Sequence, residues 1–181
     1  MTKRNVRITV LCEDLQQQVF VRYFLIGCGF HKRKLRFLPL PDGKGSGEQY
    51  VRNQYLEQVR AYRSKKAEDI CLIVLIDADT QTVQDRLNQF DRVLEENSQN
   101  KRQDDERIAI FVPKRNIETW IHYLQGETVD EETAYKKLPQ ESECKLYVEE
   151  LSDRCPSNLD ENAPSSLHTA CQEWQRILPP N

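Results

Sequence analysis

Acidic side chains follow the two most apolar segments of the chain. The segment 70–76, ICLIVLI, runs directly into Asp77 and Asp79, and the segment 6–12, VRITVLC, runs into Glu13. Carboxylates within a few ångströms of one another repel, which raises their pKa values. A hard divalent cation removes this conflict, and Mg²⁺ commonly takes only one or two protein carboxylates. The acids therefore predict a Mg²⁺ or Mn²⁺ site for phosphoryl transfer, with Glu13, Asp77 and Asp79 as ligands.

Each acid also has a plainer structural interpretation. Asp79 or Thr80 can cap the helix that is expected to follow, because their side-chain oxygens accept hydrogen bonds from the free N–H groups of a first helical turn. The helix dipole favours an acid at such a position as well. Acids at several strand ends together are harder to explain in this way, so we interpret the set as functional.

Alternating apolar and amphipathic segments position these acids. Apolar runs predict strands, and apolar residues at helical spacing predict the helices between them. This alternation is typical of an α/β fold with a parallel sheet between helices. We therefore expect a mainly parallel four-stranded sheet with helices on both faces, followed by a helical C-terminal extension. The expected strands are 6–12, 35–41, 70–76 and 107–113, and the expected helices are 14–27, 48–64, 82–96, 117–125, 131–137, 143–153 and 165–177.

The fourth expected strand leads into further polar residues. Pro113 is followed by Lys114 and Arg115, and the next helix carries Glu118 in its first turn. Functional residues of open α/β sheets gather beyond the carboxyl ends of the strands. Glu118 and Lys114 are therefore candidate catalytic residues.

Three segments resemble the TOPRIM domain, in which a Glu ends the first strand and Asp-x-Asp ends the third. They are 9-TVLCED-14, 72-LIVLIDAD-79 and 108-IAIFVPKRNIETWI-121. The resemblance covers about residues 6–125 and implies a TOPRIM-like (Rossmann-like) domain at 1–126. The helical patches beyond it predict that 127–181 is a helical extension packed on the same domain. The Glu inside the helix after the fourth strand is similar to that of OLD-family nucleases and small stand-alone RloB-like proteins.

The resemblance implies a role for each acid. Glu13 would be a metal ligand or a general acid/base, Asp77 and Asp79 the metal-binding pair, and Glu118 an acid that serves a second metal. The implied activity is metal-dependent hydrolysis of DNA or RNA. The related proteins are linked to bacterial phage defence, often beside an ATPase, so the implied partners are nucleic acid and an ATPase subunit.

Basic residues are the candidates for nucleic-acid contacts. The net charge is −3, yet residues 1–63 carry an excess of Lys and Arg. Charge on the nucleic-acid backbone would supply most of the affinity. A solvated turn at 31–36 and a flexible connection at 42–48 are the alternatives. The candidates are Lys32, Arg33 and Lys34 in the first of these segments, Lys44 in the glycine-rich second, and Lys114 and Arg115.

The composition, with 38% apolar and 30% charged residues, is typical of a soluble globular protein. No apolar run reaches a membrane-spanning length and no signal peptide is evident, so we expect a cytoplasmic protein with no membrane contact. The six cysteines are accordingly expected to be reduced. The alternative is a Cys₃His zinc site, although the short CxxC pair of structural zinc sites is missing; its ligands would be Cys144, Cys155, His168 and Cys171.

Two other functions remain open. A receiver-like signalling module would use Glu13 and Asp14 as its acidic pair and Asp77 as its phosphate acceptor. A catalytically inactive TOPRIM adaptor is favoured by Asp14, which stands where TOPRIM proteins usually have Gly. The sequence leaves the oligomeric state open.

Overall fold

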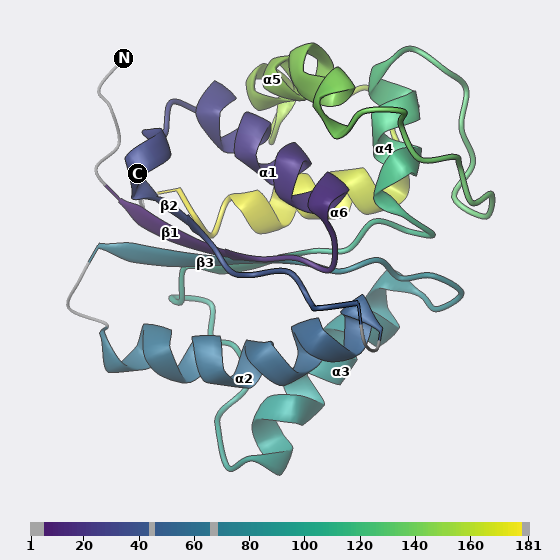
Figure 1. Ribbon diagram of the computed structural model, residues 1–181. Coiled ribbons are helices and arrows are strands. Elements are labelled where there is room, and N and C mark those ends of the chain that lie inside the picture. Colours follow the sequence, from purple (N-terminus) through teal and green to yellow (C-terminus); the bar gives the residue numbers. More distant parts are fainter. Residues whose placement is uncertain (1–5, 44–45, 66–68, 179–181) are drawn as a thin grey trace.

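Four parallel strands form one sheet at the centre of the molecule (Figure 1). The computed structural model describes residues 6–43, 46–65 and 69–178. The strand order is β2-β1-β3-β4, so the chain reverses its direction of travel across the sheet between β1 and β3. The strands are β1 (Arg7–Leu11), β2 (Leu35–Phe37), β3 (Ile70–Leu75) and β4 (Ile108–Phe111). The expected α/β fold with a parallel four-stranded sheet is confirmed.

Helices cover both faces of the sheet. Helices α1, α4, α5 and α6 lie on one face, and α2 and α3 lie on the other (Figure 1). Between these elements lie the short 3₁₀ helices η1 (Lys32–Lys34) and η2 (Glu141–Cys144). The helix bounds are α1 (Leu15–Gly27), α2 (Gly47–Ser64), α3 (Val83–Glu96), α4 (Ile117–Leu124), α5 (Lys145–Arg154) and α6 (Ser165–Trp174).

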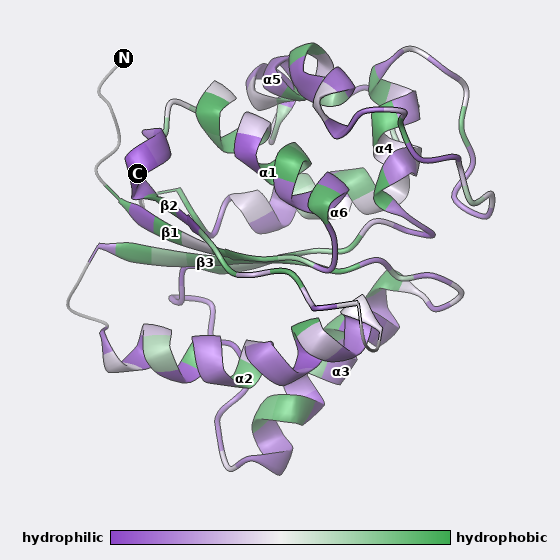
Figure 2. Cartoon of the chain, viewed as in Figure 1, coloured by the Kyte–Doolittle hydropathy of each residue, from purple (hydrophilic) through white to green (hydrophobic). Residues whose placement is uncertain are grey.

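The period of the strands explains the two cores. In β3, Cys71, Ile73 and Leu75 pack toward α1, whereas Leu72 and Val74 pack toward α2 and α3. Both faces are buried, so the strand is apolar at every position instead of at every second one. Figure 2 shows β3 as a hydrophobic strand, while α2 and α3 carry alternating hydrophobic and hydrophilic stripes.

The C-terminal helices share the core of α1 and the sheet. Val148 and Leu151 of α5 and Trp174 of α6 are buried in the same cluster as β1 and β3. The Trp174 ring meets Phe24 of α1 edge to face, with 4.9 Å between ring centroids. Residues far apart in the sequence therefore close one continuous core over this face.

A disulfide joins the end of α5 to α6. It links Cys155 to Cys171, so the expectation that all cysteines are reduced is wrong for this pair. The same bond takes two of the four ligands of the alternative zinc site. The structure describes Cys12, Cys71 and Cys144 as buried free thiols. Their burial agrees with the usual behaviour of cysteine as a small core residue.

Two expected elements differ from the structure. Strand 35–41 stops at Phe37, because Pro39 and Pro41 have no N–H group to donate to a neighbouring strand. The expected helix 131–137 is an irregular loop. There the Asp130 carboxylate accepts hydrogen bonds from the N–H groups of Glu132 and Thr133, which satisfies the backbone locally and competes with a helix.

Among the helices that the structure describes, none has the length and apolar character needed to cross a membrane.

Candidate active site at the ends of strands β1 and β3

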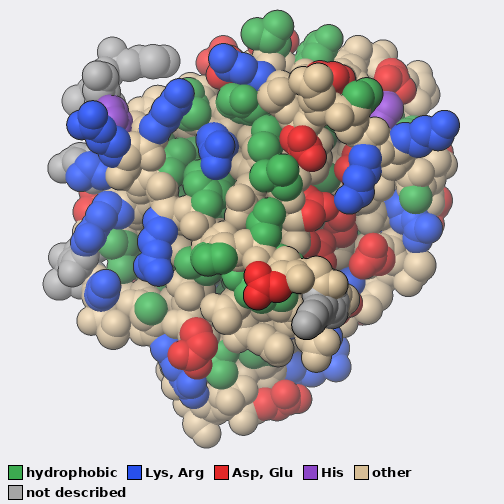
Figure 3. All heavy atoms as spheres, viewed as in Figure 1, with side chains coloured by type: hydrophobic (Ala, Val, Ile, Leu, Met, Phe, Trp, Pro, Cys, Tyr) green, Lys and Arg blue, Asp and Glu red, His purple; other side chains and the backbone are tan. Residues whose placement is uncertain are grey.

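The acids that follow β1 and β3 converge. The two strands are adjacent and parallel, with Leu11 opposite Val74, so their carboxyl ends reach the same edge of the sheet. The Glu13 carboxylate accepts a hydrogen bond from the backbone N–H of Asp77, with 2.9 Å between the atoms. In Figure 3, acidic side chains gather on the right of the view, where β1 and β3 end and α2 begins. The two acids thus meet where the strand order reverses, which is the usual ligand position in such sheets.

Gln17 binds both carboxylates at once. Its side-chain N–H₂ donates to Glu13 Oε2 at 3.1 Å and to Asp77 Oδ1 at 3.0 Å, and its Oε1 accepts the backbone N–H of Glu13 at 2.9 Å. The side chain is fully buried. Its position follows from the start of α1, where Asp14 is the N-cap and accepts the backbone N–H of Gln17 at 2.9 Å. One amide nitrogen therefore links the ends of β1 and β3.

Crowding and burial shift the protonation of these acids. Burial raises the pKa of Glu13 to about 7, with a further contribution from the charge of Asp79. Burial also raises the pKa of Asp77 well above its usual value, and the charges of Glu13, Asp14 and Glu118 add to the rise. The site therefore favours a bound proton or a bound cation over bare carboxylates at neutral pH.

Glu118 adds a buried oxygen without a hydrogen-bond partner. It is the second residue of α4 and is 2% exposed. Its Oε1 atom has no hydrogen-bond partner in the described part of the chain. Burial raises the pKa of Glu118, and the charge of Asp14 raises it further. A buried carboxylate oxygen without a partner is costly, so this position also favours a proton or a cation.

Asp79 lies in a turn and pairs with Arg86. Its φ angle is 54°, so the backbone turns at this residue instead of staying extended. Its side chain, 60% exposed, pairs with Arg86 at 3.2 Å. The expectation that Asp77 and Asp79 point the same way depended on an extended backbone, and this condition is not met at Asp79. One carboxylate oxygen of Asp79, Oδ2, is therefore already paired with Arg86.

Arg86 is a buried residue that the sequence interpretation missed. It is 1% exposed and donates to the backbone carbonyl of Asp77 at 3.0 Å and to Glu48 of α2 at 2.5 Å, in addition to Asp79. The residue thus ties α2, α3 and the loop after β3 together. The signal for it was present, because Arg86 lies three residues after Val83 and four before Phe90, on the apolar face of α3.

Gly47 brings the start of α2 against Glu13. A Cβ atom at Gly47 would lie 3.0 Å from both the Cβ and the backbone oxygen of Glu13. This distance is tighter than ordinary contacts, so glycine allows the close approach. Gly47 therefore borders Glu13. The predicted nucleic-acid contact Lys44 lies outside the described residues.

The basic residues after β4 lie at the same edge of the sheet as the acids. The Lys114 ammonium group donates to the backbone carbonyl of Gln81 at 2.9 Å and lies 4.0 Å from Glu132. Lys114 thereby holds the loop that follows Asp79. Arg115 has a φ angle of 72°, which bends the chain before α4.

The predicted basic contacts Lys32, Arg33 and Lys34 lie at the opposite end of the sheet. They form η1, which immediately precedes β2, and Leu35 pairs with Ile8 near the start of β1. At about 3.3 Å per residue, roughly 15–20 Å separate this end from the acids. Figure 3 shows basic side chains gathered on the left of the view, away from the acidic side.

The donor set matches a small hard cation in part. Mg²⁺ takes one or two protein carboxylates and keeps waters for the rest, and Glu13 and Asp77 supply two carboxylates that share one hydrogen-bond donor. Within the described residues, no group of three or more His, Cys, Asp or Glu side chains is arranged to hold a metal ion. The described residues therefore fit a cation that Glu13 and Asp77 hold and that replaces the Gln17 amide as their shared partner.

Comparisons of the chain with protein-family models, curated proteins and solved structures give no match.

Proposed function

We propose that the chain is a Mg²⁺- or Mn²⁺-dependent nuclease of TOPRIM type, which hydrolyses phosphodiester bonds of DNA or RNA. The observation that supports the proposal is that the Glu13 and Asp77 carboxylates both accept hydrogen bonds from the Gln17 amide nitrogen. They do so at the ends of β1 and β3, between which the strand order reverses. Ligands of open α/β sheets bind at this position. Crowded carboxylates there suit a cation that also binds phosphate oxygens.

Glu13 and Asp77 would hold the cation, and the buried Glu118 carboxylate would add negative charge near Asp77. When bound, a divalent cation would polarise the scissile phosphate and lower the pKa of a water molecule. Glu13 would take a proton from the attacking water and return it to the leaving oxygen. A bound cation would lower the pKa of Glu13 from its metal-free value of about 7, so Glu13 would enter the reaction ionised, as a base requires.

Positive charge beside the site comes from Lys114 and Arg115, which follow β4. Lys114 is 17% exposed and already bound to the loop after Asp79, so it would stabilise the site as well as attract phosphate. Binding through phosphate charge weakens as salt concentration rises. A cytoplasmic location and an ATPase subunit as partner complete the proposal; the location rests on the composition, and the ATPase partner rests on the TOPRIM resemblance alone.

Metal-dependent cleavage tests the proposal. The purified chain is incubated with supercoiled, linear and single-stranded DNA and with RNA, in Mg²⁺, Mn²⁺ or EDTA. We expect cleavage only with metal, and its loss in Glu13→Gln and Asp77→Asn. Glu96→Gln is the matched control, because Glu96 is exposed at the end of α3 and lies away from the site. Cleavage that persists in both site variants contradicts the proposal.

A catalytically inactive adaptor is the second candidate, and the Gln17 amide favours it. This group satisfies Glu13 and Asp77 without any cation, so the cluster is partly stabilised as it stands. Failure of the wild-type chain to bind Mg²⁺ or Mn²⁺, together with absence of cleavage, would favour this candidate.

A further inference from the structure

A pocket of about 180 Å³ lies at the opposite end of the sheet from the acids. It opens between the amino ends of β1 and β2 and the C-terminal part of α2. Five cationic side chains and the Tyr62 ring line it together with apolar residues of the strands. We call it the basic pocket; its cationic residues are Arg7, Arg33, Lys34, Arg36 and Lys65.

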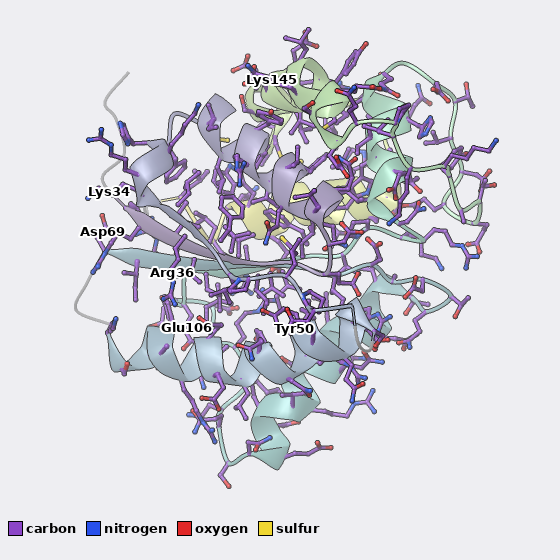
Figure 4. All side chains as sticks on the ribbon, viewed as in Figure 1. Lys34, Arg36, Tyr50, Asp69, Glu106 and Lys145 are labelled. Carbon is purple, nitrogen blue, oxygen red and sulfur yellow. A yellow bond between two sulfur atoms is a disulfide. The ribbon has the colours of Figure 1, made fainter. Side chains whose placement is uncertain are left out.

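The sheet edge explains why the basic pocket exists. Strand β2 is an edge strand, and its Leu35 and Phe37 pack toward α1. Because side chains alternate along a strand, Arg36 between them points to the other face, toward α2. Figure 4 labels Lys34 and Arg36 on the same side of the molecule, the side where basic side chains gather in Figure 3.

The charged residues that line the basic pocket are all Arg or Lys. Among the described residues that line it, none is Asp or Glu. Like charges held together in a concave surface raise the local potential and attract a counter-ion. Arginine side chains bind phosphate through two parallel N–H donors, which lysine complements as a point charge.

Size and charge together indicate the ligand. The volume is below that of ordinary drug-sized sites, which begin at about 300 Å³, and it suits a phosphate group with little else attached. A terminal phosphate monoester carries roughly −1.5 to −2 charges at pH 7, more than the single charge of an internal phosphodiester. A cluster of five cationic side chains therefore favours the terminal phosphate of a nucleic-acid strand over its internal phosphodiesters.

We propose that the basic pocket binds the terminal phosphate monoester of a nucleic-acid strand, which then runs along the open edge of β2 to the acids. This proposal rests on the proposed nuclease function. The separation of roughly 15–20 Å between the two ends of the sheet would place the cut a few nucleotides from the terminal phosphate.

Binding of labelled oligonucleotides in EDTA tests the proposal without cleavage. Single-stranded 12-mers with a 5′-phosphate, a 3′-phosphate or two hydroxyl ends are titrated with the full chain, and fluorescence anisotropy is read. We expect one phosphorylated end to bind about tenfold more tightly than the hydroxyl form. The double variant Lys34→Gln/Arg36→Gln should remove this preference. Lys145→Gln/Arg92→Gln is the control of equal charge change, with Lys145 on α5 and Arg92 on α3.

Each result decides the proposal. Equal binding of phosphorylated and hydroxyl oligonucleotides, or a preference that survives in the double variant, would overturn it. The proposal would also be overturned if a free mononucleotide displaced the labelled oligonucleotide while a terminal phosphate did not raise the oligonucleotide's affinity. The basic pocket would then bind small nucleotides instead of a strand end. A terminal-phosphate preference without cleavage in any metal contradicts only the nuclease, and cleavage without the preference contradicts only the basic pocket.

Discussion

The Glu13 carboxylate accepts the backbone N–H of Asp77, so the chain after β1 is tied directly to the chain after β3. The two residues are 64 positions apart in the sequence. This hydrogen bond lies between β1 and β3, where the strand order reverses. The side-chain N–H₂ of Gln17 donates to the same carboxylate oxygen of Glu13. The candidate site is therefore part of the connection between two central strands.

Glu13 makes stability depend on pH. Its folded pKa of about 7 lies above its ordinary value of 4.5, so the folded chain binds the proton more tightly than the unfolded chain does. The stabilisation is complete below about pH 4.5 and is lost as the pH rises through about 7. In metal-free solution, Glu13→Gln should be more stable than wild type at pH 8 by up to about 3 kcal/mol, and nearly equal to it at pH 4.5. Urea unfolding at several pH values measures this, with Glu96→Gln as control, and identical pH profiles for wild type and Glu13→Gln would contradict it.

Gln17→Leu separates the amide's role from its packing. The amide donates to Glu13 and Asp77 and lowers the pKa of both, so its removal should raise both pKa values further. We expect a stability loss of about 1–3 kcal/mol that is larger at pH 8 than at pH 5. Gln18→Leu is the matched control, because Gln18 is also buried in α1 but donates to the backbone carbonyl of Leu38. The stability loss of Gln18→Leu should be the same at pH 5 and pH 8. A stability loss of Gln17→Leu that is also the same at both pH values would contradict the prediction.

Arg86→Met should destabilise the protein more than loss of an exposed ion pair does. The substitution leaves the Asp77 carbonyl without its buried donor and leaves Glu48 with its ion pair to Arg52, and a buried acceptor without a partner costs about 1–3 kcal/mol. Asp79→Asn should cost less than about 1 kcal/mol, because the Asp79 side chain is 60% exposed. The urea midpoint of both variants is compared with that of Arg60→Met, which breaks an exposed pair with Glu57 on α2. A midpoint for Arg86→Met close to that of Arg60→Met would show that Arg86 does not hold these elements together.

Gly47→Ala should destabilise the protein, although replacing glycine by alanine in a helix usually stabilises it. Alanine ordinarily favours a helix over glycine by up to about 1 kcal/mol. At Gly47 the new Cβ would lie 3.0 Å from the backbone oxygen of Glu13, so the variant should lose about 1–3 kcal/mol and displace Glu13. Thermal unfolding of Gly47→Ala is compared with that of Gln49→Ala in the same turn of α2. A Gly47→Ala protein more stable than wild type would mean that Glu13 has room to move.

Much of the fold could be predicted from the sequence, because buried parallel strands are apolar at every position and their helices keep a clear period. The meeting of Glu13 and Asp77 followed from the same pattern once the strands were taken as adjacent. The turn at Asp79 could not be predicted, since a left-handed φ at a non-glycine residue depends on its tertiary partner, here Arg86. The place of Lys32, Arg33 and Lys34 could have been inferred, because residues that precede a strand of a parallel sheet lie at its amino end. Loop 131–137 was missed because side-chain bonds from Asp130 outweigh helical propensity there.

Calorimetric titration of Mn²⁺ at pH 8 tests the central claim most directly, since it asks whether Glu13 and Asp77 hold a cation. The wild-type chain should bind Mn²⁺ at one or two sites, with an affinity that falls as the pH is lowered through about 7 and the Glu13 carboxylate takes up a proton. Asp77→Asn should abolish this binding, and Glu96→Gln should leave it unchanged. Mn²⁺ binding that is equal in wild type and Asp77→Asn would contradict the claim that the carboxyl ends of β1 and β3 form a metal site.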